Sequence, residues 1–323
     1  MAKGAMDELP IRYYSDITVR KVDWLWYPYI PFGKITIMQG DPGDGKTTLL
    51  LYIAALLSTG RPMPGDVESK DRMAVIYQSA EDGAEDTLKP RLVSADADCS
   101  RISFIDDTEN TFSLTDTRLE AAIHECGARL LVLDPLQAYL GDNGEMNRAV
   151  GVRPVLKRLA AVADRTNCAI VLIGHMNKAS GSKGIYRGLG SIDITAIARS
   201  VLLVGRLRDD PSVRVMAHLK SSLAKEGASI AFEIGDDSNL QWLGERDITA
   251  GELLGGDGDL GDNGKVSSAV LSLREMLSIG AQPCVEIYTA FYDMDISKRS
   301  VDRAKRTLGV KSIKRADGWY WSL

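Results

Sequence analysis

The sequence predicts an α/β protein: a mainly parallel, twisted sheet flanked by helices, followed by a small C-terminal unit. Apolar runs of strand length alternate with helical stretches between residues 35 and 198, which is typical of parallel strands joined by crossover helices. Closely spaced strands at 200–205, 213–219 and 230–234 predict an antiparallel edge. A polar, glycine-rich stretch then separates the two parts. We therefore expect a first domain at 1–246, a flexible linker at 247–264 and a second domain at 265–323.

The composition is that of an ordinary globular protein. The chain has 323 residues, of which 45% are hydrophobic and 26% charged, enough to bury a full core. No apolar run approaches the roughly eighteen residues of a membrane span, and the N-terminus lacks the pattern of an export signal. The four cysteines (Cys99, Cys126, Cys168 and Cys284) are scattered without metal-ligand spacing. We expect a cytoplasmic protein with reduced thiols, no structural zinc and no membrane partner.

The most specific motif is a glycine-rich loop that matches G-x-x-x-x-G-K-[ST] between an apolar strand at 35–38 and a buried helix at 48–57. This context favours a phosphate site over a glycine-rich turn that binds nothing. Lys46 is expected on the β- and γ-phosphates and Thr47 on Mg²⁺, with backbone N–H groups and the helix N-terminus around the anion. The residues predicted to hold ATP are Gly40, Asp41, Pro42, Gly43, Asp44, Gly45, Lys46, Thr47 and Thr48.

Acidic side chains follow two of the predicted strands. The run at 73–78 leads to Glu81, which could polarise the water that attacks the γ-phosphate. The alternative is an acidic cluster at a helix N-terminus, where we expect Asp82 as the capping residue. The apolar run at 130–133 ends in Asp134, the pattern of a Walker B strand that delivers a carboxylate to Mg²⁺.

Polar and basic residues follow the strand at 169–174. His175, at its tip, can hydrogen-bond the γ-phosphate and report its loss, although a lone histidine is usually structural. The next stretch, 178–190, is rich in glycine and predicts a basic loop that grips a nucleic-acid backbone. The alternative is an unremarkable flexible loop. The cations of this stretch are Lys178, Lys183 and Arg187.

Three further segments complete the first domain. Residues 22–33 are dense in aromatics and proline and are expected to pack as an irregular cover on the sheet edge. One of these rings could touch the nucleotide base, but core packing is the expected role. A helix is expected at 115–127, opened by Thr115 and Asp116 and closed by Gly127. Another is expected at 148–165.

The C-terminal residues resemble a winged helix. Residues 265–323 carry a net charge of +4, which leaves −9 on the first 264 residues. Helices are expected at 266–277, 284–293 and 297–308, followed by a hairpin around Asp317 and Gly318. In a winged helix the third helix enters the major groove; such modules also bind proteins, so a replication or regulatory partner is the alternative. The candidate DNA contacts are Lys298, Arg299, Arg303 and Arg306, with Lys314 and Arg315 on the wing.

Taken together, the motifs at 22–254 resemble the RecA-like ATPases, specifically the RepA-like hexameric helicases of plasmids and other mobile elements. The resemblance rests on GDPGDGKTT, QSAEDG, LLVLDP, IGHMNK and HLKSSLAKEG. It implies a hexameric ring with ATP at the subunit interfaces and single-stranded DNA held by the central basic loops. It also implies Glu81 as catalytic glutamate, Asp134 as Walker B acid and His175 as sensor.

One part of the family pattern is missing. Related ring helicases carry a Lys-x-Arg that reaches across the interface, whereas this chain has Lys220-Ser221-Ser222. Arg206 is the substitute candidate, with Lys220 as a second cation. We expect an ATP-dependent DNA helicase or translocase; the alternative is an ATP-dependent DNA-binding regulator or scaffold that does not unwind DNA. A metabolic or signalling kinase would need an acceptor pocket and is the weaker expectation.

Overall fold

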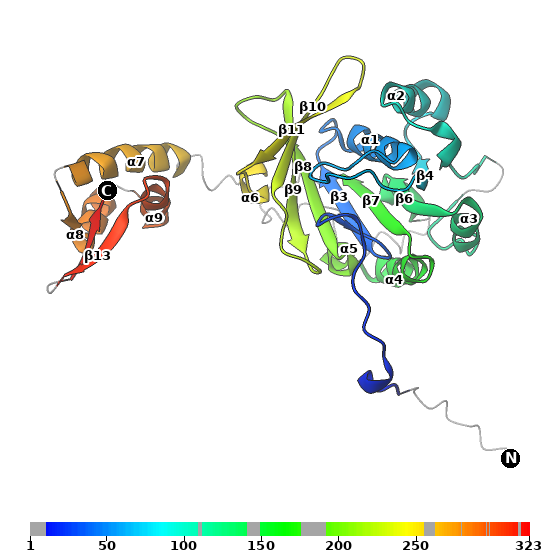
Figure 1. Cartoon of the computed structure of the whole chain (residues 1–323), viewed down its shortest axis with the longest axis horizontal. Helices are drawn as coiled ribbons and strands as arrows, with labels where there is room; N and C mark the ends of the chain where they lie inside the picture. The colour runs from blue at the N-terminus through cyan, green and yellow to red at the C-terminus, as the bar shows by residue number, and fades with distance from the viewer. Residues whose placement is uncertain are drawn as a thin grey trace. The chain divides into compact units, whose positions relative to one another are not determined.

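The computed structural model describes residues 11–108, 112–140, 149–175, 192–254, 262–278, 280–294, 296, 298–315 and 318–323. The chain divides into two compact units, Met1–Leu253 and Leu254–Leu323 (Figure 1). In the described residues no helix has both the length and the apolar character that a membrane crossing requires.

A nine-stranded sheet forms the centre of the first unit. Its strands are β3 (Ile35–Gly40), β4 (Ala74–Ser79), β5 (Ile102–Ser103), β6 (Ala128–Asp134), β7 (Ala169–His175), β8 (Ser200–Arg206), β9 (Val213–Ser221), β10 (Ser229–Ile234) and β11 (Leu240–Arg246). The order is β11-β10-β9-β8-β3-β7-β6-β4-β5, parallel from β8 to β5 and antiparallel from β8 to β11. The predicted mainly parallel sheet with an antiparallel edge is therefore confirmed. Strand β11 was not predicted.

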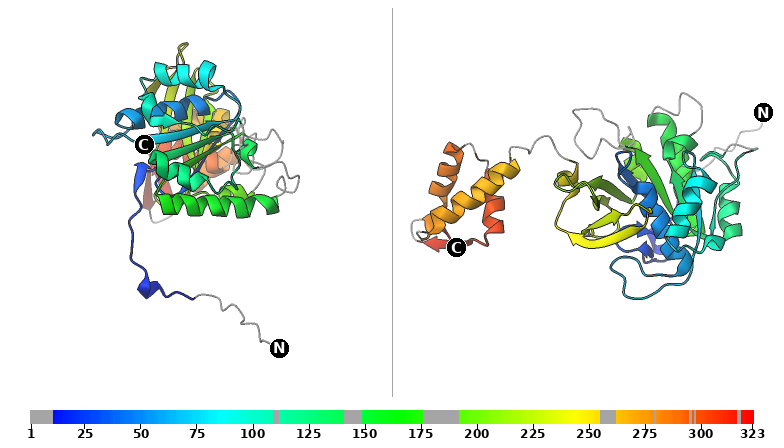
Figure 2. Two further views of the ribbon diagram at one scale, coloured as in Figure 1. Left: turned by 90° about the vertical axis from the view of Figure 1, so that its right-hand side faces the viewer. Right: turned by 90° about the horizontal axis from the view of Figure 1, so that it is seen from above.

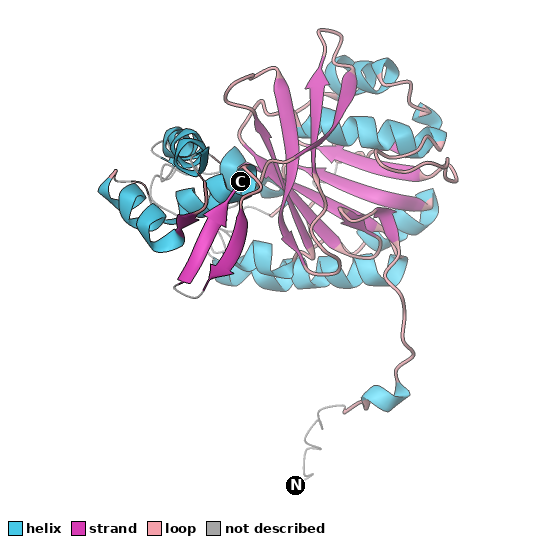
Figure 3. Ribbon diagram, turned by 60° about the vertical axis from the view of Figure 1, so that its left-hand side comes forward, coloured by secondary structure: helices cyan, strands magenta, loops and turns pink. Residues whose placement is uncertain are grey.

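Helices cover both faces of this sheet, as Figure 3 shows. One face carries α1 (Lys46–Thr59), α2 (Lys89–Ser94) and the single π-helical turn Ala84–Leu88. The other carries α3 (Leu119–Cys126), α4 (Ala149–Thr166), α5 (Ile192–Ile197) and the 3₁₀ turn Leu136–Tyr139. Along β3, Ile37 packs into the second of these layers and Met38 into the first. The alternation of a strand thus divides the core into two apolar layers.

The aromatic segment before β3 contains a short hairpin in place of the expected irregular cover, and the expected core packing is confirmed for Trp26, Tyr29 and Phe32. Strands β1 (Trp24–Trp26) and β2 (Ile30–Pro31) pair antiparallel. Trp26 is fully buried, its ring centroid lies 4.6 Å from that of Tyr29, and its Nε1 donates to the Pro64 carbonyl oxygen at 3.0 Å. The satisfied indole N–H explains how so large a polar-tipped ring is accommodated in the core.

Two predicted helix starts are also corrected. Helix α3 begins at Leu119, three residues after Asp116, whose carboxylate accepts hydrogen bonds from the backbone N–H and the guanidinium of Arg118. After β4, the helical turn has Gly83 at its N-cap without a side-chain bond, so Asp82 is not the capping residue. Asp82 lies 3.4 Å from Arg91 of α2.

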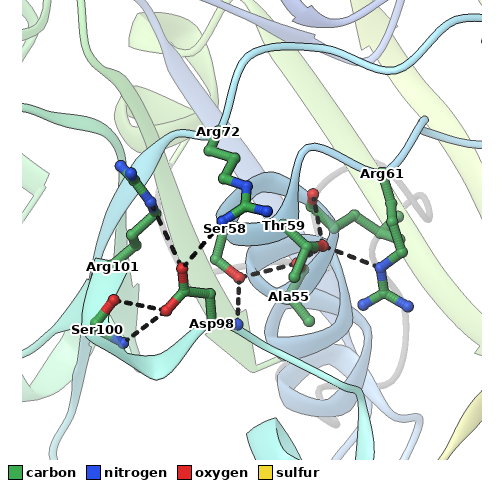
Figure 4. A network of polar contacts seen from close by, with 9 residues as sticks. Ala55, Ser58, Thr59, Arg61, Arg72, Asp98, Ser100 and Arg101 are labelled. Carbon is green, nitrogen blue, oxygen red and sulfur yellow. Dashed lines mark hydrogen bonds and ion pairs between the residues drawn. The ribbon is translucent and has the colours of Figure 1, made fainter.

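A polar network fastens the C-terminal end of α1 to the chain that leads into β5 (Figure 4). The Ser58 hydroxyl donates to the Ala55 carbonyl oxygen at 2.9 Å and accepts from the Asp98 N–H at 3.0 Å. The Asp98 carboxylate accepts from the Ser100 hydroxyl at 2.6 Å and lies near the guanidinium groups of Arg72 and Arg101. These hydrogen bonds lower the pKa of Asp98, with the Ser100 hydroxyl as the largest cause. The network fixes the helix that follows the glycine-rich loop.

His218 gives the first unit a pH-dependent stability. It is buried, stacked on Tyr29, accepts the Gly227 N–H through Nδ1 at 2.9 Å, and burial lowers its pKa to about 4 from 6.5. Below pH 6.5 the His218 side chain of the unfolded chain binds a proton, whereas that of the folded chain stays neutral until the pH nears 4. The free energy of unfolding therefore decreases as the pH falls from 6.5 toward 4. We expect the free energy of unfolding to fall by up to about 3 kcal/mol over that range from this group. Urea unfolding of wild type and His218→Gln at pH 7, 5.5 and 4.5 measures it: the variant should show a shallower loss, and equal slopes would contradict the prediction.

The second unit, seen from two sides in Figure 2, combines helices α7 (Asp262–Ser278), α8 (Cys284–Asp293) and α9 (Lys298–Thr307) with strands β12 (Gln282–Pro283), β13 (Lys311–Arg315) and β14 (Gly318–Ser322). The strand order is β12-β14-β13, all antiparallel. Leu273, Ile287, Phe291, Val301 and Trp321 are buried in its core. The helix α6 (Ala250–Leu253) and the start of α7 lie inside the stretch 247–264, which is therefore not flexible linker throughout.

Candidate functional site

The glycine-rich loop lies at the carboxyl end of β3, between β7 and β8. Two of its glycines have left-handed backbone angles, with φ of 83° at Gly43 and 90° at Gly45, which other residues rarely adopt. Gly40 is required for space, because a Cβ there would lie 2.2 Å from the Val204 carbonyl oxygen of β8. The loop then runs directly into α1, whose N-terminus provides unpaired N–H groups for an anion.

Lys46 is held in the mouth of this loop. Its side chain is buried, and its Nζ donates to the carbonyl oxygens of Gly40 and Asp41 at 2.9 and 2.8 Å. Burial lowers the pKa of Lys46, and the carboxylates of Asp44 and Asp134 oppose that shift. Asp44 in turn accepts the Asp41 N–H at 2.9 Å. These hydrogen bonds fold the loop around the Lys46 ammonium group.

Asp134 and Thr47 form the expected metal side of the site. The Thr47 hydroxyl donates to Asp134 Oδ2 at 2.7 Å, and the buried Tyr77 hydroxyl donates to the same oxygen at 3.0 Å. Burial raises the pKa of Asp134, while the bonds from Thr47 and Tyr77 lower it. A hydroxyl and a carboxylate beside a phosphate loop are the oxygen donors that Mg²⁺ prefers. The donor set therefore fits the ion that the loop predicts.

Tyr77 is a residue that the sequence interpretation missed. Strand β4 pairs with β6 so that Ser79 faces Asp134, and alternation directs Tyr77 to the same layer as α1. The polar residues at the end of this otherwise apolar strand could have indicated a functional side chain. The hydrogen-bond partner of Tyr77, however, depends on the register between β4 and β6.

We expect Tyr77→Phe to weaken the Mg²⁺-dependent part of nucleotide binding by about tenfold, since loss of a hydrogen bond to a metal ligand has effects of this size. The ring stays in the core, so the fold is retained. The measurement is titration with a fluorescent ADP analogue in the presence and absence of Mg²⁺. Tyr29→Phe, which loses a buried hydroxyl bond to the Ala228 carbonyl oxygen, is the matched control. Equal losses in both variants, or losses without Mg²⁺, would contradict this role.

Glu81 and His175 lie close together, beside the glycine-rich loop. Glu81 is exposed, and its Oε2 lies 3.6 Å from Nε2 of His175 at the tip of β7. The Ser79 hydroxyl accepts the backbone N–H of Asp82 at 3.0 Å and shapes the turn that carries Glu81. Nδ1 of His175 is buried and has no hydrogen-bond partner in the described part of the chain. An exposed carboxylate next to a strand-tip histidine is suited to hold a water molecule beside a phosphate.

The two candidate finger residues lie at opposite ends of the sheet. Arg206 ends β8 and donates through Nη2 to the Gly43 carbonyl oxygen at 2.7 Å. Lys220 lies near the end of β9, where its Nζ donates at 2.9 Å to the carbonyl oxygens of Thr195 and Ala198 at the end of α5. Arg206 thus touches its own phosphate loop, whereas Lys220 is distant from it in the sheet.

Most of the predicted nucleic-acid residues cannot be placed as side chains. Lys178, Lys183 and Arg187 lie outside the described residues. Lys298, Arg299 and Arg303 belong to α9, but their side chains are likewise outside the description. Arg306 is exposed on the last turn of that helix, and Lys314 and Arg315 are exposed on β13.

Comparison with known proteins agrees with this geometry. Residues 8–181 match the AAA domain family. The DNA repair protein RadA of Halalkalibacterium halodurans is 29% identical over 157 residues, 47% of this chain and 30% of the relative. RadA of Bacillus subtilis is 29% identical over 155 residues, again 47% and 30%. The chain thus spans less than a third of the length of these curated relatives.

A solved structure shows the same fold. The KaiC-like protein PH0186 of Pyrococcus horikoshii OT3 superposes with a TM-score of 0.50 at 17% identity, over 66% of this chain and 90% of that one. The sheet order and the loop site define a P-loop ATPase with a RecA-type fold. Because the family match covers more than half of the sequence, the chain belongs to the AAA domain family.

Proposed function

We propose that this protein is an ATP-driven helicase or translocase of the RepA-like type, which assembles as a hexameric ring and moves on single-stranded DNA. The observation that carries the proposal is the contact of 3.6 Å between Glu81 and His175. It joins the residue suited to position the attacking water to the end of β7, three residues before Lys178. Loss of the γ-phosphate near Glu81 would therefore change the position of the start of the basic stretch 178–190.

In this proposal the site residues have separate roles. Lys46 and the N–H groups of the loop bind the phosphates, and Thr47 with Asp134 would hold Mg²⁺, which neutralises charge on the transferred phosphoryl group. Glu81 orients water, and His175 responds to the γ-phosphate. Lys220 is the cation proposed to reach a neighbouring subunit. Similarity to RadA, a DNA repair protein by name, supports DNA as the partner.

The C-terminal unit is proposed to be a winged helix that contacts DNA. Three helices and a three-stranded antiparallel sheet support this assignment, as do the exposed cations on β13. A protein partner is the alternative for this unit. A regulator that binds ATP and DNA without unwinding is the second candidate for the whole chain, favoured by the missing arginine after Lys220.

ATP hydrolysis with and without single-stranded DNA tests the proposal. We expect DNA to stimulate hydrolysis several-fold in wild type, and we expect Lys183→Ala combined with Arg187→Ala to lose the stimulation while keeping the basal rate. The matched control replaces Lys157 and Arg158, an exposed Lys and Arg on α4, with alanine. A slow rate that is indifferent to DNA would reject the motor and favour the regulator.

A further inference from the structure

Arg206 lies beside the phosphate loop of its own chain because of the register of the sheet. Strand β8 runs parallel to β3, with Gln39 opposite Leu203, and both strands continue toward the same edge. Val204 then touches Gly40, and Arg206 comes level with the loop. The pairing of Arg206 with Arg214 in β9 holds its backbone in place. The placement is therefore a property of one subunit's sheet and requires no neighbour.

The guanidinium of Arg206 makes three contacts within its own chain. Nη2 donates to the Gly43 carbonyl oxygen at 2.7 Å, Nη1 donates to the Pro211 carbonyl oxygen at 3.4 Å, and Nε lies 3.7 Å from Asp44 Oδ1. The Asp44 carboxyl is mostly buried and also accepts the Asp41 N–H. Arg206 therefore holds two consecutive loop residues from outside, one through the backbone and one through the side chain.

The bond to Gly43 decides which way one peptide of the loop faces. In a trans peptide the carbonyl oxygen and the following N–H point in opposite directions. With the Gly43 carbonyl directed at Arg206, the Asp44 N–H turns inward and donates to the Asp41 carbonyl oxygen at 3.2 Å. Gly43 has a left-handed φ of 83°, so its peptide has unusual freedom to rotate. An external cation is an effective way to select one orientation.

We propose that Arg206 is a positioning residue for the phosphate loop of its own subunit, and is not the cation that crosses to a neighbouring nucleotide. The inference rests on the ATP-hydrolysing part of the proposed function. Arginine is suited to the task because its planar guanidinium presents several donors in fixed directions, one toward a carbonyl and another toward a carboxylate, whereas lysine carries a compact point charge on a flexible stem.

Nucleotide binding provides the first test. We expect Arg206→Ala to weaken binding of a fluorescent ATP analogue by about tenfold, the size expected for loss of a charge-assisted hydrogen bond. Arg206→Lys should recover little of this. Arg208→Ala, which removes an exposed arginine from the same β8–β9 connection, should stay within about twofold of wild type, as the weak effect of exposed charges predicts. Unchanged thermal unfolding of all three variants excludes a folding defect.

Mixing two variants provides the second test. A Lys46→Ala subunit cannot use its own loop, but it still carries Arg206. If Arg206 acts across an interface, mixing Lys46→Ala with Arg206→Ala creates some complete sites and hydrolysis returns. If it acts within its own subunit, no mixed site is complete and we expect no recovery.

The outcomes separate this inference from the proposed function. Normal nucleotide binding by Arg206→Ala with slow hydrolysis that returns on mixing would overturn the inference, and so would a variant that behaves as wild type throughout. Wild-type protein that binds the analogue but does not hydrolyse ATP would instead reject the proposed function. In that case the binding comparison of Arg206→Ala with Arg208→Ala still tests the positioning role.

Discussion

Replacing Glu81 with glutamine is expected to slow ATP hydrolysis by about a hundredfold or more, the range attributed to a positioned acid or base. Nucleotide binding should remain within about twofold of wild type, because Glu81 is exposed and contacts His175, which lies outside the loop. The substitution keeps the size and shape of the side chain and removes the charge that we propose holds the attacking water. Steady-state hydrolysis and titration with a fluorescent ATP analogue measure the two effects separately.

Asp82→Asn is the matched control for this prediction. Asp82 is the adjacent acid, carries the same charge and lies on the same turn, but it faces Arg91 at 3.4 Å. We expect its loss to change hydrolysis by less than about threefold, since partly exposed pairs contribute little. If the two substitutions slow hydrolysis equally, the total negative charge of the turn determines the rate. Glu81 would then not be the water-positioning residue. Full activity in Glu81→Gln would reject it outright.

The sequence could predict the parallel part of the fold because each central strand is an uninterrupted apolar run. Strand β6 is the clearest case, since every residue from Leu130 to Leu133 is buried. Strand β11 escaped prediction for the opposite reason: it lies at the sheet edge, and four of its seven residues are exposed. A strand with little burial carries little alternation for a pattern to reveal.

The site was predictable where one short motif contains it, and not where two distant segments meet. Lys46 and Thr47 follow from the loop pattern alone. The contact of Arg206 with Gly43 joins residues 163 positions apart and depends on the register between β3 and β8. The bond from Tyr77 to Asp134 depends in the same way on β4 and β6. Apolar patterning identifies which residues are strands, but the offset between neighbouring strands is set by packing across the whole core.

Gly40→Ala is expected to damage both stability and nucleotide binding. The added methyl group would lie 2.2 Å from the Val204 carbonyl oxygen, and this contact is with backbone that cannot rotate away. Relief requires β3 and β8 to separate where the loop begins, at a cost of about 1–3 kcal/mol for an overpacked core position. The same movement displaces the carbonyl oxygen of Gly40 that Lys46 holds at 2.9 Å. Urea unfolding and fluorescent nucleotide titration should therefore change together.

Gly251→Ala in α6 is the control, because a Cβ there would meet only the Thr249 hydroxyl at 3.8 Å. Alanine also favours a helix over glycine by roughly 1 kcal/mol, so this variant should be neutral or slightly more stable. A stable Gly40→Ala protein that binds nucleotide normally would mean that the two strands can part without moving the loop. Loss of binding with unchanged stability would mean that the loop alone moves. Coupled loss is the result expected if the close approach of β3 and β8, which also brings Arg206 to Gly43, is what holds the phosphate loop in its binding conformation.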